Sequence, residues 1–368
     1  MLKKAYRRVR QFMPAFSFWG IVLAALCGIL HLAFVVSMPF ADYFNEGPAA
    51  AVRALLAHLT AWIPFSLAET LILFLPVLFV FLLVICIRAA AVGWRQAMYC
   101  IIALLSVAAI IYAMFVLTFA AGYRATPLDD KMGIPTEKIS AAQLAEAAAI
   151  LAREAEASLD EITFRPQSSS VMPNDFDTLS EKLMDAYGRV CEKYPFIQKL
   201  RSRVKPIALS EPMTYTHISG VYTMFTGEAN INVNYPDYVI PYTAAHELAH
   251  QRGIARENEA NFVAFLVCLE SDDPYIRYSG YLNMYEYVAS ALYSASSEYY
   301  YEVLSSLDLR MRCEMIAYSE FFDRYRENVV AEVSEAVNNS YLVIQGTEGT
   351  KSYGMVVDLA VAYLLGED

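Results

Sequence analysis

The residues with the clearest chemical potential are His246, Glu247 and His250, which stand in the pattern HELAH. A separation of four residues places both imidazoles on one face of a helix. Two nitrogen donors in this arrangement suit Zn2+, and the intervening glutamate can reach a zinc-bound water as a general base. The chain has only 5 histidines, so chance is a poor explanation for the spacing. The motif predicts a zinc site, and no site for an organic cofactor is evident.

A catalytic zinc needs a third protein ligand and an open position. Arg256 stands where an HExxHxxGxxH protein has its third histidine, which excludes that subclass. Two glutamates remain at the start of the next predicted helix. Glu257 shares a helix face with Asn261, whereas Glu259 points roughly 200° away. We therefore predict Glu257 as the third ligand and keep Glu259 as the alternative.

Helices and a few strands must position these residues. Pro241 fits the first turn of the HELAH helix, and Gly253 fits a position just past its end. Residues 227–234 belong to a β-rich stretch in which we expect one or two strands. Such a strand could pair with an extended substrate or be purely structural. Several side chains remain open as the group that polarises the scissile carbonyl, namely His217, Tyr222, Tyr281 and Tyr285.

Helices are also predicted on both sides of the β-rich stretch. Ser140 and Gln143 form a capping-box pattern for a helix to about residue 159. Thr178 and Glu181 form a second such pattern for a helix to about residue 194. The final apolar segment, 355–366, is too short to cross a membrane, so we expect a packed helix there.

The first third of the chain predicts three transmembrane helices, at about residues 16–40, 66–88 and 97–122. Hydrophobic residues make up 57% of the chain, and their excess lies before residue 123. Each apolar run approaches or exceeds the ~20 residues that a helical span requires. Three successive runs have no amphipathic partners that could cover them in water. The segment between the first two runs suits a short interfacial helix ending near Trp62 or, equally, a solvated loop.

Positive charges indicate the orientation of these spans. Arg88 and Arg95 bracket the loop between the second and third runs, and five more cations precede the first run, namely Lys3, Lys4, Arg7, Arg8 and Arg10. We therefore expect a cytoplasmic N-terminus. The predicted membrane domain covers residues 1–123, and an extracytoplasmic domain covers residues 124–368.

The outer domain is strongly acidic. Residues after 122 hold 20 Lys and Arg against 36 Asp and Glu, a formal net charge of −16. This balance argues against nucleic acid as a partner. Three of the 6 cysteines fall inside apolar runs, so we expect no disulfide framework. The expected partners are the lipid bilayer and a peptide or protein, and the sequence leaves the oligomeric state open.

The segment from Glu257 to Asn261 resembles the gluzincin pattern, in which a glutamate on a second helix completes the zinc site after HExxH. The resemblance implies a mainly α chain whose outer domain is an α+β, zincin-like metallopeptidase with a small sheet. It also implies that Asn261 supports the site by hydrogen-bonding a ligand histidine, either His246 or His250, without binding the metal itself. The chain departs from many gluzincins in having an amide at position 261 and a short connection between the two helices.

The chain also resembles the bacterial domain-of-unknown-function family 3810 over nearly its whole length. Four motifs carry this resemblance: S-G-x-Y at 219–222, T-G-E-A-x-I/V-N at 226–232, HELAHQxG at 246–253 and E-x-E-A-N at 257–261. It implies a zinc peptidase in the bacterial cell membrane, with an unknown substrate.

These observations predict a membrane-anchored zinc endopeptidase that cleaves a peptide or protein near the outer membrane face. His246, His250 and Glu257 would hold the zinc, and Glu247 would take the proton of the attacking water and pass it to the leaving amine. The alternative is a non-catalytic zinc-binding sensor or scaffold that binds peptides. The intact Glu247 favours the peptidase, because a sensor has no need of a base.

Overall fold

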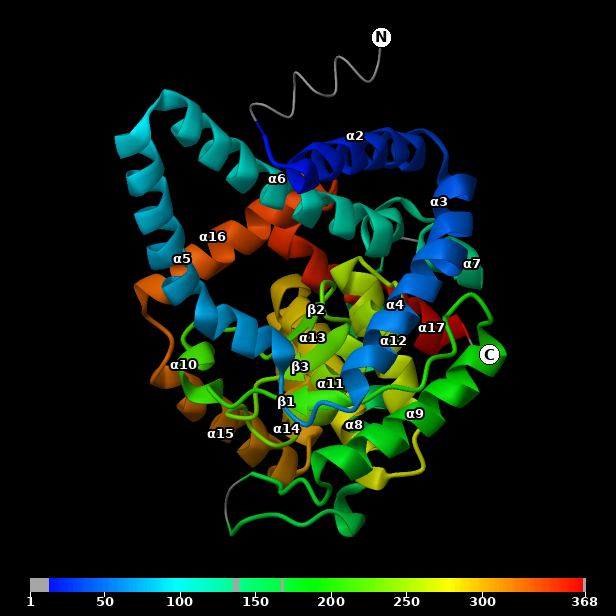
Figure 1. Cartoon of the computed structure of the whole chain (residues 1–368). Helices are drawn as coiled ribbons and strands as arrows, with labels where there is room; N and C mark the ends of the chain where they lie inside the picture. Colours follow the sequence, from blue (N-terminus) through cyan, green and yellow to red (C-terminus); the bar gives the residue numbers. More distant parts are fainter. Residues whose placement is uncertain (1–12, 135–138, 167–168, 367–368) are drawn as a thin grey trace.

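The computed structural model describes residues 13–134, 139–166 and 169–366. The chain is mainly helical with one small sheet, and the HELAH helix lies near its centre (Figure 1). The cationic cluster predicted to hold the N-terminus in the cytoplasm, from Lys3 to Arg10, lies outside the described residues.

Three helices are long and apolar enough to cross a membrane, namely α2 (Ala15–Val36), α5 (Leu67–Val92) and α6 (Trp94–Thr118). Helices α2 and α6 pack side by side, whereas α5 leaves its apolar surface exposed. Figure 1 shows α5 and α6 diverging from their connection at Gly93. The first apolar helix ends earlier than predicted, because Ser37 caps a new helix by accepting a hydrogen bond from the Phe40 amide.

The segment between the first two apolar helices is helical and not a loop, as the first of its two predicted alternatives requires. Its position at the membrane interface stays a prediction. The segment comprises α3 (Met38–Phe44), a π-helical turn η1 (Asn45–Ala49) and α4 (Ala50–Ala61). One side of α4 exposes apolar residues, and Trp62 just beyond it is 78% exposed. The other side buries Arg53 and Ala57.

After α6 the chain forms two longer helices, α8 (Ala141–Glu156) and α9 (Phe176–Lys193). Short elements precede and separate them, namely η2 (Ala120–Arg124), α7 (Leu128–Met132) and η3 (Leu159–Glu161). The capping box predicted at Ser140 and Gln143 is present. The one predicted at Thr178 and Glu181 is wrong. Helix α9 begins earlier, because the Asp175 carboxylate accepts the Thr178 amide at 2.8 Å and so caps the first turn.

The described residues form one three-stranded sheet, in the order β1 (Val204–Pro206), β3 (Glu228–Ile231) and β2 (Gly220–Thr223). Strand β3 is parallel to β1 and antiparallel to β2. The suggestion that residues 227–234 pair with a substrate is therefore wrong, because both edges of β3 already carry a strand. Strand β2 forms one edge of the sheet, opposite β1, and it packs against the HELAH helix.

The HELAH helix α11 (Val239–Gln251) is buried along its whole length, and α12 (Glu257–Leu269) is buried over nearly all of its own. Helices α8, α9, α13 (Pro274–Ala295) and α17 (Val356–Gly366) contribute to the same core. The final apolar segment is thus a packed helix, as predicted. The remaining elements are α10 (Ser210–Thr214), α14 (Ser297–Ser306), α15 (Leu309–Asp323), α16 (Val329–Ile344) and η4 (Gly349–Met355).

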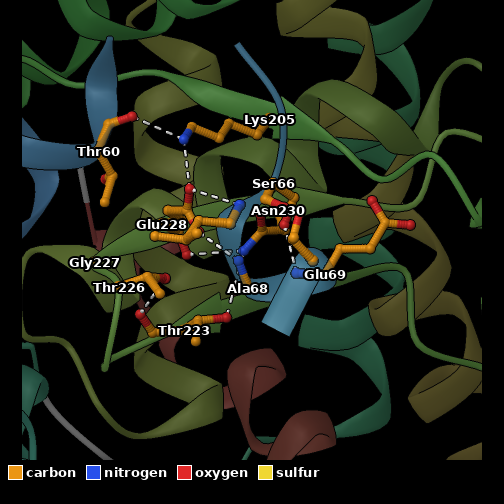
Figure 2. A network of polar contacts seen from close by, with 12 residues as sticks. Thr60, Ser66, Ala68, Glu69, Lys205, Thr223, Thr226, Gly227, Glu228 and Asn230 are labelled. Atoms are coloured by element: carbon orange, nitrogen blue, oxygen red, sulfur yellow. Dashed lines mark hydrogen bonds and ion pairs between the residues drawn. The ribbon is translucent and has the colours of Figure 1, made fainter. Parts of the chain in front are cut away.

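A buried polar network joins the sheet to the start of α5 (Figure 2). The Glu228 carboxylate on β3 accepts the amides of Leu67 at 3.1 Å and Ala68 at 2.8 Å. It also pairs with Lys205 on β1, whose ammonium group donates to the Thr60 carbonyl at the end of α4. The carboxylate therefore sits at the positive end of the α5 dipole, where negative charge is favourable.

Candidate metal centre

Helix α11 presents His246 and His250 one turn apart on the same face. Their ring centroids lie 4.6 Å apart, and the ring planes are nearly perpendicular at 89°. Both histidines are buried, with side chains 11% and 8% exposed. The helix has little freedom to rotate these rings away from each other, because every residue from Val239 to Gln251 is buried.

Helix α12 brings Glu257 to the same point. Its Oε2 atom lies 3.2 Å from Nε2 of His246 and 3.3 Å from Nε2 of His250. Among the described residues, this Oε2 has no hydrogen-bond partner of good geometry. In a tetrahedral site with metal–ligand bonds of about 2.0–2.1 Å, neighbouring donor atoms lie about 3.3–3.4 Å apart. The two distances from Glu257 match this spacing, and all three donor atoms lie within 4.8 Å of one another, so the residues fit a shared zinc ion.

Glu259, the alternative ligand, lies elsewhere. One of its carboxylate oxygens accepts Arg256 Nη1 at 2.7 Å and the Leu128 amide at 3.0 Å. Arg256 in turn donates to the carbonyls of Tyr123 and Ala125. The structure thus brings Glu257 to the histidines and uses Glu259 and Arg256 to fasten the start of α12 to the chain leaving α6.

The hydrogen-bond partners of the two histidines differ from the predicted ones. The His250 Nδ1 atom lies 2.7 Å from the Ile254 carbonyl, which fixes Nε2 as the atom that faces Glu257. In the described part of the chain, His246 Nδ1 has no hydrogen-bond partner. Asn261 donates instead to the Tyr287 hydroxyl at 3.4 Å. The expected hydrogen bond from Asn261 to a histidine is not formed here.

The electrostatics of the cluster are dominated by burial and by the Glu257 charge. Burial alone raises the pKa of Glu257, but the two imidazoles hold it well below its usual value. Burial lowers the pKa of His250, and the neighbouring carboxylate more than compensates. Burial raises the pKa of Glu247, which the histidines only partly oppose. Glu257 is thus an anion at neutral pH, and Glu247 is a better proton acceptor than an exposed glutamate.

The edge strand β2 crosses α11 at Glu247. A Cβ atom on Gly220 would lie 2.7 Å from Glu247 Oε1 and 2.7 Å from Thr243 Cγ2, which is closer than real Cβ atoms come. The backbone amide of Tyr222 also hydrogen-bonds the Glu247 carboxylate and lowers its pKa. The S-G-x-Y motif therefore serves to hold the strand against Glu247.

The link between α11 and α12 is held by a fully buried cation on α4. Arg53 donates to the carbonyls of Arg252, Thr118 and Asn45, and also to the Asn45 side chain. Asn45 donates to the Gly253 carbonyl. The carbonyls of Arg252 and Thr118 belong to helix C-termini, where positive charge is favourable. Burial lowers the pKa of Arg53 only to about 10, so the side chain stays charged.

A pocket of about 500 Å³ opens beside His246 and Glu247. Its walls come from the loop before β2 and from helices α11, α12, α13, α15 and α16 together with η4. Five tyrosines contribute to these walls, namely Tyr235, Tyr242, Tyr287, Tyr318 and Tyr353. No Lys or Arg of the described residues lines the pocket, and Glu335 is its one carboxylate besides Glu247. The pocket therefore suits an uncharged or cationic side chain better than an anionic one.

Of the four residues considered for polarising a carbonyl, His217 alone lies in the pocket wall. Its backbone adopts the left-handed conformation with φ 59°, and its Nε2 atom lies 2.7 Å from the Tyr325 carbonyl. Tyr287 and Tyr353 line the pocket but were not predicted. Among 26 tyrosines, no local pattern marks the ones that will meet at a site formed by distant helices.

Comparison with known proteins places this architecture in a family. A family model described as a protein of unknown function (DUF3810) matches residues 44–361, from the end of α3 into the terminal helix α17. No curated protein and no solved structure matches the chain. The match covers both glutamates of α12, the HELAH helix, the sheet and two of the three apolar helices. The chain belongs to the DUF3810 family of proteins of unknown function.

Proposed function

We propose that the chain is a membrane-anchored zinc metallopeptidase with a zincin-like, gluzincin-type outer domain. The observation that carries the proposal is the convergence of His246 Nε2, His250 Nε2 and Glu257 Oε2 within 4.8 Å at a buried point next to Glu247. Three protein ligands leave one position open, which is typical of catalytic rather than structural zinc. The proposed location is the bacterial cell membrane, with the N-terminus in the cytoplasm and the pocket outside.

Zinc bound by these three side chains would supply Lewis-acid activation of a water molecule and of the scissile carbonyl. Glu247 lies at the pocket wall with a raised pKa, which suits it to accept a proton and return it to the leaving amine. Gly220 and the Tyr222 amide hold that carboxylate in place. Strand β2 offers its outer edge to an extended peptide, a common recognition mode in peptidases.

The proposal is tested by metal analysis and peptidase assays on the full-length protein in lipid nanodiscs. The wild type should hold one zinc per chain and cleave unfolded polypeptides. Glu247→Gln should keep the zinc and lose activity by about 10²-fold or more, because a proton acceptor is removed while the ligands remain. Glu154→Gln, an exposed change on α8, serves as the matched control.

The two main alternatives give different results. Stoichiometric zinc without activity on diverse substrates would favour the non-catalytic sensor or scaffold. A purified protein without zinc, or with another transition metal, would contradict the proposed cofactor.

A further inference from the structure

Helix α16 has two faces of opposite character. Ser334, Glu335 and Asn338 lie on one side and line the pocket beside the metal cluster. Ala331 and Leu342 on the same side are buried. This side therefore faces the interior of the outer domain and forms one wall of the pocket.

The opposite side of α16 carries an exposed apolar stripe, which consists of Val329, Val330, Val333, Val337 and Ile344. Each of these side chains is more than half exposed. At 100° per residue they fall within an arc of about 100°, which contains no charged residue. Contiguous exposed apolar surface of this kind marks a contact with another protein or with a membrane.

The position of α16 indicates which of these it contacts. The Tyr341 ring, near the C-terminal end of α16, lies 6.4 Å from the ring of Phe115 on α6. Leu342 shares a buried cluster with Phe119, at the end of the same apolar helix. In the view of Figure 1, α16 appears between the diverging helices α5 and α6. The apolar stripe thus begins where the exposed apolar surface of α6 ends.

We propose that α16 lies in the outer leaflet of the bilayer, with its apolar stripe among the acyl chains and its opposite side forming the pocket wall. The helix sequence contains no Lys or Arg, so its binding energy must come from buried apolar area rather than from attraction to anionic lipid. This inference rests on the membrane insertion of α2, α5 and α6, and it does not depend on zinc or on catalysis.

Together with the proposed peptidase function, on which this step alone rests, the arrangement names a substrate class for the pocket. A helix is about 10 Å across with its side chains, so the pocket lies about one helix diameter from the hydrocarbon. A polypeptide segment that emerges from the bilayer reaches the pocket without leaving the membrane surface. A polypeptide tethered to lipid or to a membrane span therefore meets the site at a much higher local concentration than a free peptide.

Tryptophan quenching by brominated phosphatidylcholine tests the proposal on the full-length protein in nanodiscs. The three native tryptophans, Trp19, Trp62 and Trp94, are replaced by phenylalanine, and one reporter is then introduced. Val337→Trp reports on the apolar stripe, and Val333→Trp is a second reporter if the first protein does not fold. Phe79→Trp on α5 is the control for lipid contact, and Tyr301→Trp on α14 is the control for exposure to water; both native residues are more than half exposed.

Brominated lipid should reduce the fluorescence of Val337→Trp and of Phe79→Trp by about twofold or more and leave that of Tyr301→Trp unchanged. The same result is expected in nanodiscs without anionic lipid. An unquenched Val337→Trp together with a quenched Phe79→Trp would overturn the proposal, because water, a protein partner or a second copy would then cover α16. An unquenched Phe79→Trp would remove the membrane insertion on which the proposal rests, and it would leave the zinc assays unaffected.

Discussion

Gly220 and Glu247 are in direct contact, and the contact leaves no room for a side chain at position 220. A Cβ atom there would lie 2.7 Å from Oε1 and 2.8 Å from Cγ of Glu247. The proposed general base therefore keeps its position because an edge strand of the sheet passes over it at van der Waals distance.

Gly220→Ala is expected to impair catalysis while sparing metal binding. The added methyl group displaces the Glu247 carboxylate. The three metal ligands are other side chains, on α11 and α12, and they stay in place. A displacement of about 1 Å costs on the order of 10²-fold in rate. Zinc content and peptidase activity, measured on the same preparation, test this expectation.

Gly188→Ala on α9 is the matched control, because a Cβ atom at that position would have no neighbour within 4 Å. A methyl group in the middle of this helix should stabilise the protein by about 0.5–1 kcal/mol and leave activity intact. Full activity in Gly220→Ala would show that Glu247 does not need this contact.

Glu257→Gln is expected to weaken zinc binding by more than ~100-fold. Removal of a residue that only hydrogen-bonds a metal ligand typically costs ~10–100-fold in metal affinity, and loss of a ligand should cost more. The reason is that an amide oxygen replaces the buried carboxylate between the two histidines. Glu259→Gln should retain zinc, because that carboxylate binds Arg256 and the Leu128 amide instead. Competition with a chromogenic chelator measures both affinities, and equal losses would contradict the difference in roles.

Glu228→Gln is expected to destabilise the protein by about 3–5 kcal/mol, because it leaves the Lys205 ammonium buried without an opposite charge. It also removes the anion at the start of α5. Glu154→Gln breaks an exposed ion pair with Arg153 and should change stability by less than about 0.5 kcal/mol. Thermal unfolding in detergent measures both changes, and a similar small effect for the two variants would refute the importance of the network.

Glu286→Gln is expected to change the pH dependence of stability. Burial, assisted by Glu314, raises the pKa of Glu286 to about 7, although the Tyr238 hydroxyl bond opposes the shift. A carboxyl group with a raised pKa favours the folded state at low pH, and this contribution is lost as the pH rises from about 4.5 through 7. The variant should therefore exceed the wild type by about 3 kcal/mol at pH 8, and the two should be equal at pH 4.

Unfolding midpoints measured across this pH range provide the test. Glutamine still accepts the Tyr238 hydroxyl bond, so the comparison isolates the charge. A difference that does not vary with pH would show that Glu286 ionises normally in the folded chain.

Local sequence determined the features that depend on neighbours along the chain. The i, i+4 spacing of His246 and His250 places them on one face of any helix, and the length and composition of three apolar runs produce helices able to cross a bilayer. The capping box at Ser140 has the same local origin. At Thr178 the same pattern gave the wrong start, because Asp175 accepts the Thr178 amide and caps the helix three residues earlier.

Tertiary structure alone decided the contacts between distant segments. It paired Lys205 with Glu228 and placed β3 between two strands. It also brought Arg53 to the link between α11 and α12, where it donates to the Arg252 carbonyl. It also made α16 a wall of the pocket. The sequence had already favoured Glu257 over Glu259 by its helix face, but only the packing of α12 against α11 brought that carboxylate to the histidines. Such contacts depend on how helices and strands pack across the core, and residue types along a single sequence do not specify which buried partners will meet.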